Sequence, residues 1–65
     1  MTRKDFELIA ETIKGAIQYE RDFNKNQEKV DGFKYLALTF ASTLGANNPR
    51  FDRARFLKAC GVITA

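Results

Sequence analysis

Four basic residues close together near the end of the chain are the side chains best suited to do chemistry. They are Arg50, Arg53, Arg55 and Lys58, and they make up four of the five positive charges in residues 32–65, against a single acid. A guanidinium group is a rigid fork of N–H donors that binds carboxylate or phosphate oxygens in pairs. We therefore take these four residues as candidate anion- or partner-binding residues.

The expected helix around these residues makes their positions unusual. Asp52 is of a residue type that caps helices, and it predicts a short helix over residues 53–60 with Arg53 and Arg55 in the first turn. Cations are disfavoured there, because the start of a helix carries a partial positive charge, and an anion opposite them would remove that cost. The anion could come from an external partner or from an acid of the same chain, namely Asp5, Glu7, Glu20, Asp22 or Asp31.

Catalytic and metal chemistry find little support in the sequence. There is no histidine, no phosphate-binding or dinucleotide-binding glycine motif, and no nucleophile motif. Glu7 and Glu11 are four residues apart but are interpreted as part of a solvated helix face. Cys60, near the end of its helix, is interpreted as a small buried residue, since the helix dipole there raises a thiol pKa. We predict no enzyme activity, no catalytic residue, no metal site and no cofactor.

The third helix carries local signals at both of its ends. Phe51 just before the cap and Phe56 in the second turn have the spacing of a hydrophobic staple. Gly61 stands where a left-handed residue ends a helix, and Val62 and Leu57 are the apolar pair that accompanies such a stop. These signals predict a short, well-delimited helix.

Two longer helices are predicted before it. Thr2 as N-cap, with Asp5 three residues on, starts a helix over residues 3–21. The polar stretch 22–29 predicts a turn in which Asn24 or Asn26 caps a second helix over 27–44, which Gly45 would end. Each helix has an apolar stripe at helical spacing: Phe6, Ile9, Ala10, Ile13, Ala16 and Ile17 in the first, and Val30, Phe33, Ala37, Phe40, Ala41 and Leu44 in the second.

These elements predict an all-α fold, an antiparallel helical hairpin with the short third helix packed across it. Residues 1–65 would form a single small helical domain. A chain of this length buries only about 60% of its unfolded surface, so its net stability is expected to be roughly 3–5 kcal/mol. Four apolar residues fall outside the two stripes: Leu8, Tyr19, Tyr35 and Leu38. We predict that they form an apolar interface with a protein partner or with further copies of the chain.

Charge and hydropathy limit the other classes of partner. The net charge is +3, with seven acids against six bases in residues 1–31. Four clustered cations would neutralise few phosphates, and the connection before the third helix is longer than that of a helix-turn-helix, so nucleic acid remains an alternative partner only. No apolar run is long enough to span a membrane, and the start of the chain lacks the apolar segment of a signal peptide. We therefore expect a cytoplasmic protein without a membrane partner.

The two ends of the chain carry a recognisable pattern. "MTRKDFELIAETIK" and "NPRFDRARFLKACG", residues 1–14 and 48–61, share an F-x-x-I-A start and an N-P-R-F-D-x-x-R-F-L-x-A-C-G end with a group of small tailed-bacteriophage and prophage proteins, which the chain resembles. The resemblance implies a phage accessory protein in the bacterial cytoplasm. Small phage proteins of this kind often bind and inhibit host factors, including defence systems.

The residues and the resemblance together lead to one expectation and two alternatives. We expect a non-enzymatic accessory protein that binds a host protein. A nucleic-acid-binding regulator is one alternative. A homo-oligomer that sequesters an anion or nucleotide, with arginines of several copies converging, is the other.

Overall fold

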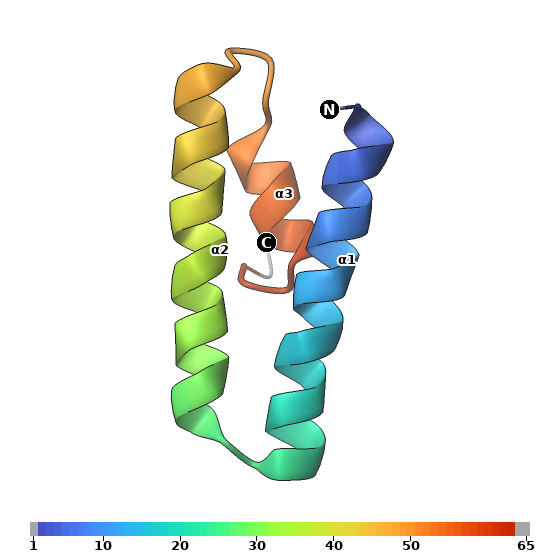
Figure 1. The fold of residues 1–65 in the computed structure, drawn as a ribbon, viewed down its shortest axis with the longest axis vertical. Helices are drawn as coiled ribbons and strands as arrows, with labels where there is room; N and C mark the ends of the chain where they lie inside the picture. Colours follow the sequence, from blue (N-terminus) through green and yellow to red (C-terminus); the bar gives the residue numbers. More distant parts are fainter. Residues whose placement is uncertain (1, 64–65) are drawn as a thin grey trace.

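The chain forms an antiparallel helical hairpin with a short helix packed against one side. The computed structural model describes residues 2–63, and its elements are α1 (Arg3–Tyr19), the π-helical turn η1 (Glu20–Asn24), α2 (Gln27–Asn47) and α3 (Arg53–Ala59). α1 and α2 run side by side in opposite directions, and α3 lies against both (Figure 1). The described residues contain no strand, so the predicted all-α hairpin with a short third helix is confirmed.

The start of α1 is fixed as the sequence predicts. The backbone N–H of Asp5 donates to Thr2 Oγ1 at 3.4 Å, and the N–H of Thr2 donates to Asp5 Oδ2 at 2.8 Å. These two bonds form a complete capping box. The Thr2 hydroxyl also donates to Asp5 Oδ2 at 3.2 Å. The bonds that the backbone N–H and the hydroxyl of Thr2 donate to this carboxylate hold the pKa of Asp5 below its usual value, because they favour the charged form.

The connection between α1 and α2 differs from the prediction. α1 ends at Tyr19 rather than Arg21, and the chain continues as one π-helical turn to Asn24, so that only Lys25 and Asn26 link the helices. The N–H of Asn26 donates to the Glu20 carbonyl at 2.9 Å, and Asn26 Oδ1 caps α2 by accepting from the N–H of Lys29 at 3.1 Å. The residues predicted as a turn over 22–29 are thus mostly helical, because these bonds satisfy the backbone within the connection.

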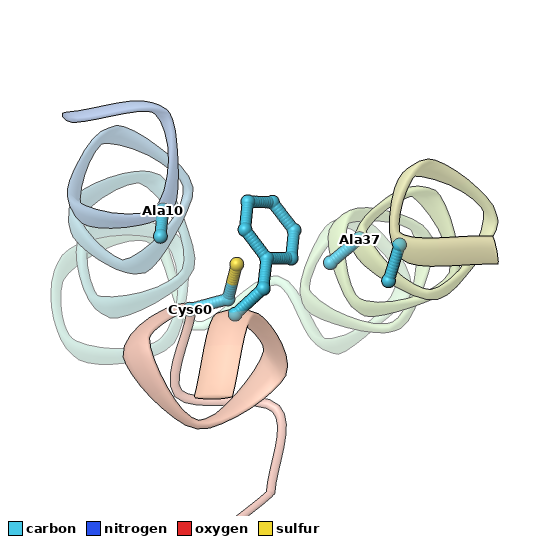
Figure 2. Close-up of a cluster of buried hydrophobic side chains, with 5 residues drawn as sticks. Ala10, Ala37 and Cys60 are labelled. Atoms are coloured by element: carbon cyan, nitrogen blue, oxygen red, sulfur yellow. The ribbon is translucent and has the colours of Figure 1, made fainter. Parts of the chain in front are cut away.

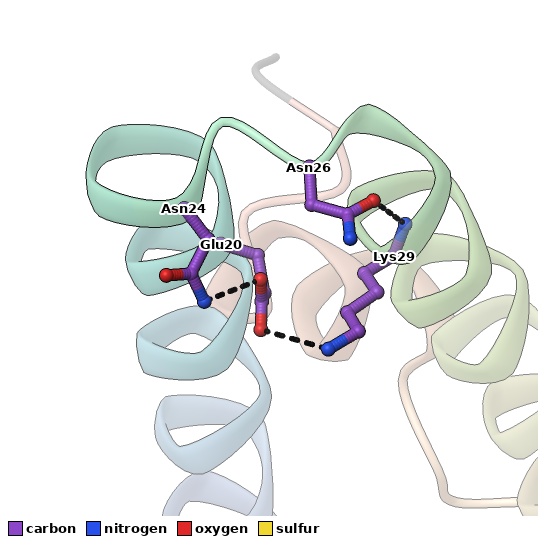
Figure 3. A network of polar contacts seen from close by, with 4 residues as sticks. All are labelled: Glu20, Asn24, Asn26 and Lys29. Atoms are coloured by element: carbon purple, nitrogen blue, oxygen red, sulfur yellow. Dashed lines mark hydrogen bonds and ion pairs between the residues drawn. The ribbon is translucent and has the colours of Figure 1, made fainter.

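A polar cluster holds this connection together (Figure 3). Glu20 is buried, and its carboxylate accepts a hydrogen bond from Asn24 Nδ2 at 2.8 Å. Lys29 Nζ from α2 lies 3.7 Å from the other carboxylate oxygen. The buried charge therefore has a partner on each side of the turn, as a buried carboxylate requires.

α2 starts at Gln27 as predicted but runs past Gly45 to Asn47, so the prediction that Gly45 ends it is wrong. Asn48 is extended and Pro49 follows, so the helix ends where proline prevents the preceding residue from remaining helical. Gly45 has another role. A Cβ there would lie 3.1 Å from Cζ and Nη2 of Arg53, whose guanidinium packs over this point of α2.

α3 spans Arg53–Ala59 and is one residue shorter than predicted. The predicted cap, hydrophobic staple and glycine stop are all confirmed. Asp52 Oδ1 accepts from the N–H of Arg55 at 3.0 Å, and the rings of Phe51 and Phe56 lie 5.4 Å apart. Gly61 has a φ of 78°, which lets the N–H of Val62 donate to the Leu57 carbonyl at 3.0 Å.

The core is small, and alanine is its commonest residue. Every residue of the two predicted apolar stripes is buried or half-buried, which confirms both. Alanines of α1 and α2 face Cys60 of α3 (Figure 2), and Phe56 stacks on Phe40 at 5.7 Å. Among residues 2–63, seven apolar side chains are buried: Ala10, Ile17, Val30, Ala37, Ala41, Phe56 and Cys60. Most large apolar side chains therefore keep part of their surface in contact with solvent.

Candidate partner-binding site

A wide, open groove lies between α1 and α3, and we call it the α1–α3 groove. Its volume is about 920 Å³. The first half of α1, the connection after Asn47 and α3 all contribute to it. The lining residues are Arg3, Phe6, Glu7, Ala10, Glu11, Asn48, Arg50, Phe51, Asp52, Arg55, Phe56 and Ala59.

Three aromatic side chains pack together at this groove. Phe6 of α1 meets Phe51 edge-on with ring centroids 5.0 Å apart, and Phe51 in turn contacts Phe56. Phe56 is buried, whereas Phe6 and Phe51 are half-buried. The hydrophobic staple that starts α3 therefore also supplies an apolar surface within the groove.

Charged side chains of both signs surround these aromatic rings. Arg50 and Arg55 line the groove together with Arg3, Glu7 and Glu11 of α1. Arg3 Nε lies 3.9 Å from Glu7 Oε1. Within residues 2–63, no carboxylate oxygen lies within 4.0 Å of a side-chain nitrogen of Arg50 or Arg55. These two guanidinium groups are thus exposed beside an apolar surface without an ion-pair partner in the described part of the chain.

The four predicted basic residues do not form one patch. Arg53 packs over Gly45 on α2, and Lys58 is exposed in the last turn of α3, outside the lining of the groove. A cation at that end of a helix is favourable, so Lys58 needs no anion to explain it. Only Arg50 and Arg55 remain together. No local pattern indicated that Arg3, from the other end of the chain, would line the groove with them.

The acids named as possible internal partners are engaged elsewhere. Each lies near a different group: Asp5 near Thr2, Glu7 near Arg3, Glu20 near Asn24 and Lys29, Asp22 near Arg21, and Asp31 near Gln27. At the start of α3, the Asp52 carboxylate already occupies the position that suits an anion. Within the described residues, no acid of the same chain therefore pairs with Arg50 or Arg55, and an external partner is the remaining source of an anion.

The four predicted interface residues are all exposed. The exposed fractions are 64% for Leu8, 56% for Tyr19, 73% for Tyr35 and 46% for Leu38. Their helical positions place them on different sides of the molecule, so they do not form a single surface. Three large apolar residues of the described chain that belong to the same class were missed: Leu36, which borders the stripe of α2, Phe23, which lay in the expected turn, and Ile63, which follows α3.

Cys60 is fully buried, as predicted. Burial raises the pKa of its thiol to about 11. Among residues 2–63, no group of three acids, cysteines or histidines is placed to hold a metal ion.

Comparisons with protein-family models, with curated proteins and with solved structures find no match for the chain. Among the described helices, none is both long enough and apolar enough to cross a membrane.

Proposed function

We propose that this chain is a non-enzymatic binding protein and that the α1–α3 groove takes a segment of a protein partner. The observation that carries this proposal is the pairing of half-buried aromatic rings with two exposed arginines that lack an ion-pair partner in the described chain. An apolar centre surrounded by polar and charged groups is the usual composition of a protein interface, in which arginine and aromatic residues contribute most of the binding energy.

The charges of the groove favour a polypeptide over a nucleic acid. Glu7 and Glu11 line the same groove as Arg50 and Arg55, so a phosphate backbone would meet repulsion from one wall. A peptide can instead present a carboxylate to the arginines and a cation to the glutamates. The partner segment would thus carry an acidic side chain beside an apolar one, the acid on Arg50 and Arg55 and the apolar group against Phe6 and Phe51.

The resemblance to small phage proteins supplies the setting for this proposal. In that setting the partner is a bacterial host protein, and occupation of one of its surfaces by this chain would inhibit it. The alternative of anion sequestration by converging arginines has less support, because Arg53 and Lys58 lie outside the groove.

Affinity capture from bacterial lysate, followed by mass spectrometry, tests the proposal. The immobilised wild-type chain is compared with the double variant Arg50→Ala/Arg55→Ala and with the control Arg21→Ala, an exposed arginine outside the groove that lies beside Asp22. We expect a discrete host protein with the wild type and with Arg21→Ala, and its loss with the double variant. Each desolvated arginine contact removed is expected to weaken binding by about 2 kcal/mol.

A nuclease-treated lysate provides the decisive control. Capture that survives nuclease treatment supports a protein partner. Capture that disappears with nuclease, or that is equally strong for the groove variant, would contradict the proposal.

A further inference from the structure

The flank of α1 that faces away from α3 carries a second apolar stripe. Arg3 and Glu7 line the groove and thereby mark the flank that faces α3. The opposite flank contains residues at spacings of three and four, which places them on one side of the helix and its π-helical continuation. They are Leu8, Thr12, Gly15, Tyr19 and Phe23, all exposed, and the rings of Tyr19 and Phe23 pack 5.4 Å apart.

α2 has a matching flank. The guanidinium of Arg53 over Gly45 marks the side of α2 that faces α3. The other side holds Gly32, Leu36, Thr39 and Thr43, and a shallow depression of about 190 Å³ lies there, lined by Leu36, Thr39, Phe40, Thr43 and Leu44. Viewed along the hairpin, α3 lies on one side of α1 and α2, and no described element covers the other side (Figure 2). We call this uncovered surface of α1 and α2 the open face.

The open face has almost no charge. None of the residues just named on α1 and α2 is an aspartate, glutamate, lysine or arginine. The charged residues at its two ends, Asp5 and Lys29, already interact with Thr2 and Glu20. A second copy placed by a two-fold axis would present the same neutral surface, so no like charges would meet in the middle of the interface.

Two glycines on the open face have no explanation within one chain. Gly15 and Gly32 lie inside α1 and α2, where alanine is the more favourable residue, and a Cβ at either position would have nothing within 4 Å. Missing side chains allow another helix backbone to come close. The bare backbone at these points therefore fits a helix packed on this face from outside.

The size of the surface fits a dimer. The chain exposes 4844 Å², whereas a folded monomer of its mass, 7.4 kDa, is expected to expose about 4,200 Å². A stable dimer buries about 800 Å² on each partner. The hairpin extends 36 × 21 Å in its two longest directions, which is room enough for such an interface on its broad face (Figure 1).

We propose that two copies of this chain associate through their open faces. The two hairpins form a four-helix layer, the half-buried rings and aliphatic side chains of each hairpin are covered by the other, and α3 lies on the outside of each copy. This inference does not rest on the proposed function. It adds to it, because both α1–α3 grooves remain accessible in the dimer.

Sedimentation equilibrium of the purified chain tests the dimer. The variant is Leu36→Glu, which places a charge in the middle of the open face, and the matched control is Tyr35→Glu, an exposed position on the outer side of α2. We expect a wild-type dimer, an unchanged Tyr35→Glu dimer, and dimerisation weakened about 100-fold or more by Leu36→Glu, because the two-fold axis buries the new charge twice. Circular dichroism of each variant checks that it remains helical.

Gly15→Ala separates the interface from effects on folding. In the single chain this change adds a helix-favouring residue in open space, so it should stabilise the monomer. In the dimer the added methyl group meets the other copy, and dimerisation should weaken about tenfold or more. A monomeric wild type, or a dimer that Leu36→Glu and Gly15→Ala leave unchanged, would overturn the proposal.

Discussion

At the scale of single residues, the reactivity of the Cys60 thiol is a measure of how often the core opens. It lies fully buried among the alanines of α1 and α2, and its thiol pKa is raised to about 11. Since the thiolate is the reactive form, the folded protein should be protected from alkylation at pH 8 both by burial and by protonation. We expect labelling by a thiol-specific reagent to be about 10²–10⁴-fold slower than in the denatured chain, the factor set by a stability of roughly 3–5 kcal/mol.

The labelling rate should rise with denaturant, because the reaction requires an opening of α3 from the hairpin. A folded protein that is labelled as fast as the denatured chain would contradict the burial of Cys60. The burial of Cys60 could be predicted from the sequence, but the cause of its raised pKa could not. A lone cysteine in an apolar stretch was correctly interpreted as a core residue, although the helix dipole was invoked for its pKa and burial is the cause found.

Capping residues were predictable from the sequence, and the positions of long side chains were not. Thr2 and Asp52 were identified as helix caps, and Asn26 was one of two candidates together with Asn24, because a cap bonds within three residues of itself. Arg53 and Arg55 looked equivalent in sequence, yet one packs over α2 and the other lines the groove. Their separation depends on how α3 packs against two distant helices, for which no local pattern exists.

At the scale of elements, the connection between α1 and α2 contains a residue whose substitution should stabilise the fold. Lys25 adopts a left-handed conformation with a φ of 54°, which costs a residue with a side chain roughly 1 kcal/mol relative to glycine. We expect Lys25→Gly to raise the free energy of unfolding by up to about 1 kcal/mol, offset in part by the greater entropy of the unfolded chain. Urea denaturation measures the change.

Lys25→Ala is the matched control for this change. It removes the same charge and the same long side chain but keeps the Cβ, so it should give no gain in stability. Equal effects of the two substitutions would show that the charge of Lys25, rather than its backbone conformation, sets the stability of the connection.

Local sequence signals did not predict where α1 and α2 end. Gly45 was taken as a stop because glycine commonly follows the last turn of a helix. It is helical instead, and its missing side chain accommodates Arg53 from α3. The π-helical turn over Glu20–Asn24 was also unforeseen, because it depends on Glu20 being held in a buried position by Asn24 and Lys29. Both errors arise from contacts between elements, whereas the helix starts, which rest on local caps, were predicted correctly.

At the scale of the whole molecule, the side of the hairpin that carries α3 differs in composition from the opposite side. Its own side has the groove, with aromatic rings and charges of both signs. The opposite side is neutral and apolar, with Leu8, Tyr19 and Leu36 exposed. The sequence indicated an excess of exposed apolar residues, but it could not assign them to faces, since that requires knowing on which side of the hairpin α3 packs.

The neutral side leads to a prediction about thermal stability. If two copies associate through the open face, the folded state is a dimer and unfolding releases two chains, so mass action makes the melting temperature depend on concentration. We expect the melting temperature of the wild type to rise by about 5–10 °C over a hundredfold increase in protein concentration, because that increase stabilises the dimer by about 2.7 kcal/mol, or roughly 1.4 kcal/mol per chain. Far-UV circular dichroism, which follows the loss of helix on unfolding, measures the transition at each concentration.

Leu36→Glu should remove this dependence, because the variant unfolds as a monomer at every concentration, and its melting temperature should match that of the wild type at high dilution. Tyr35→Glu, on the outer side of α2, should keep the dependence in full. A wild-type melting temperature that stays constant across the range would mean that the small alanine-rich core alone stabilises the chain. In that case the large apolar side chains of the open face contribute nothing to the stability of the native state.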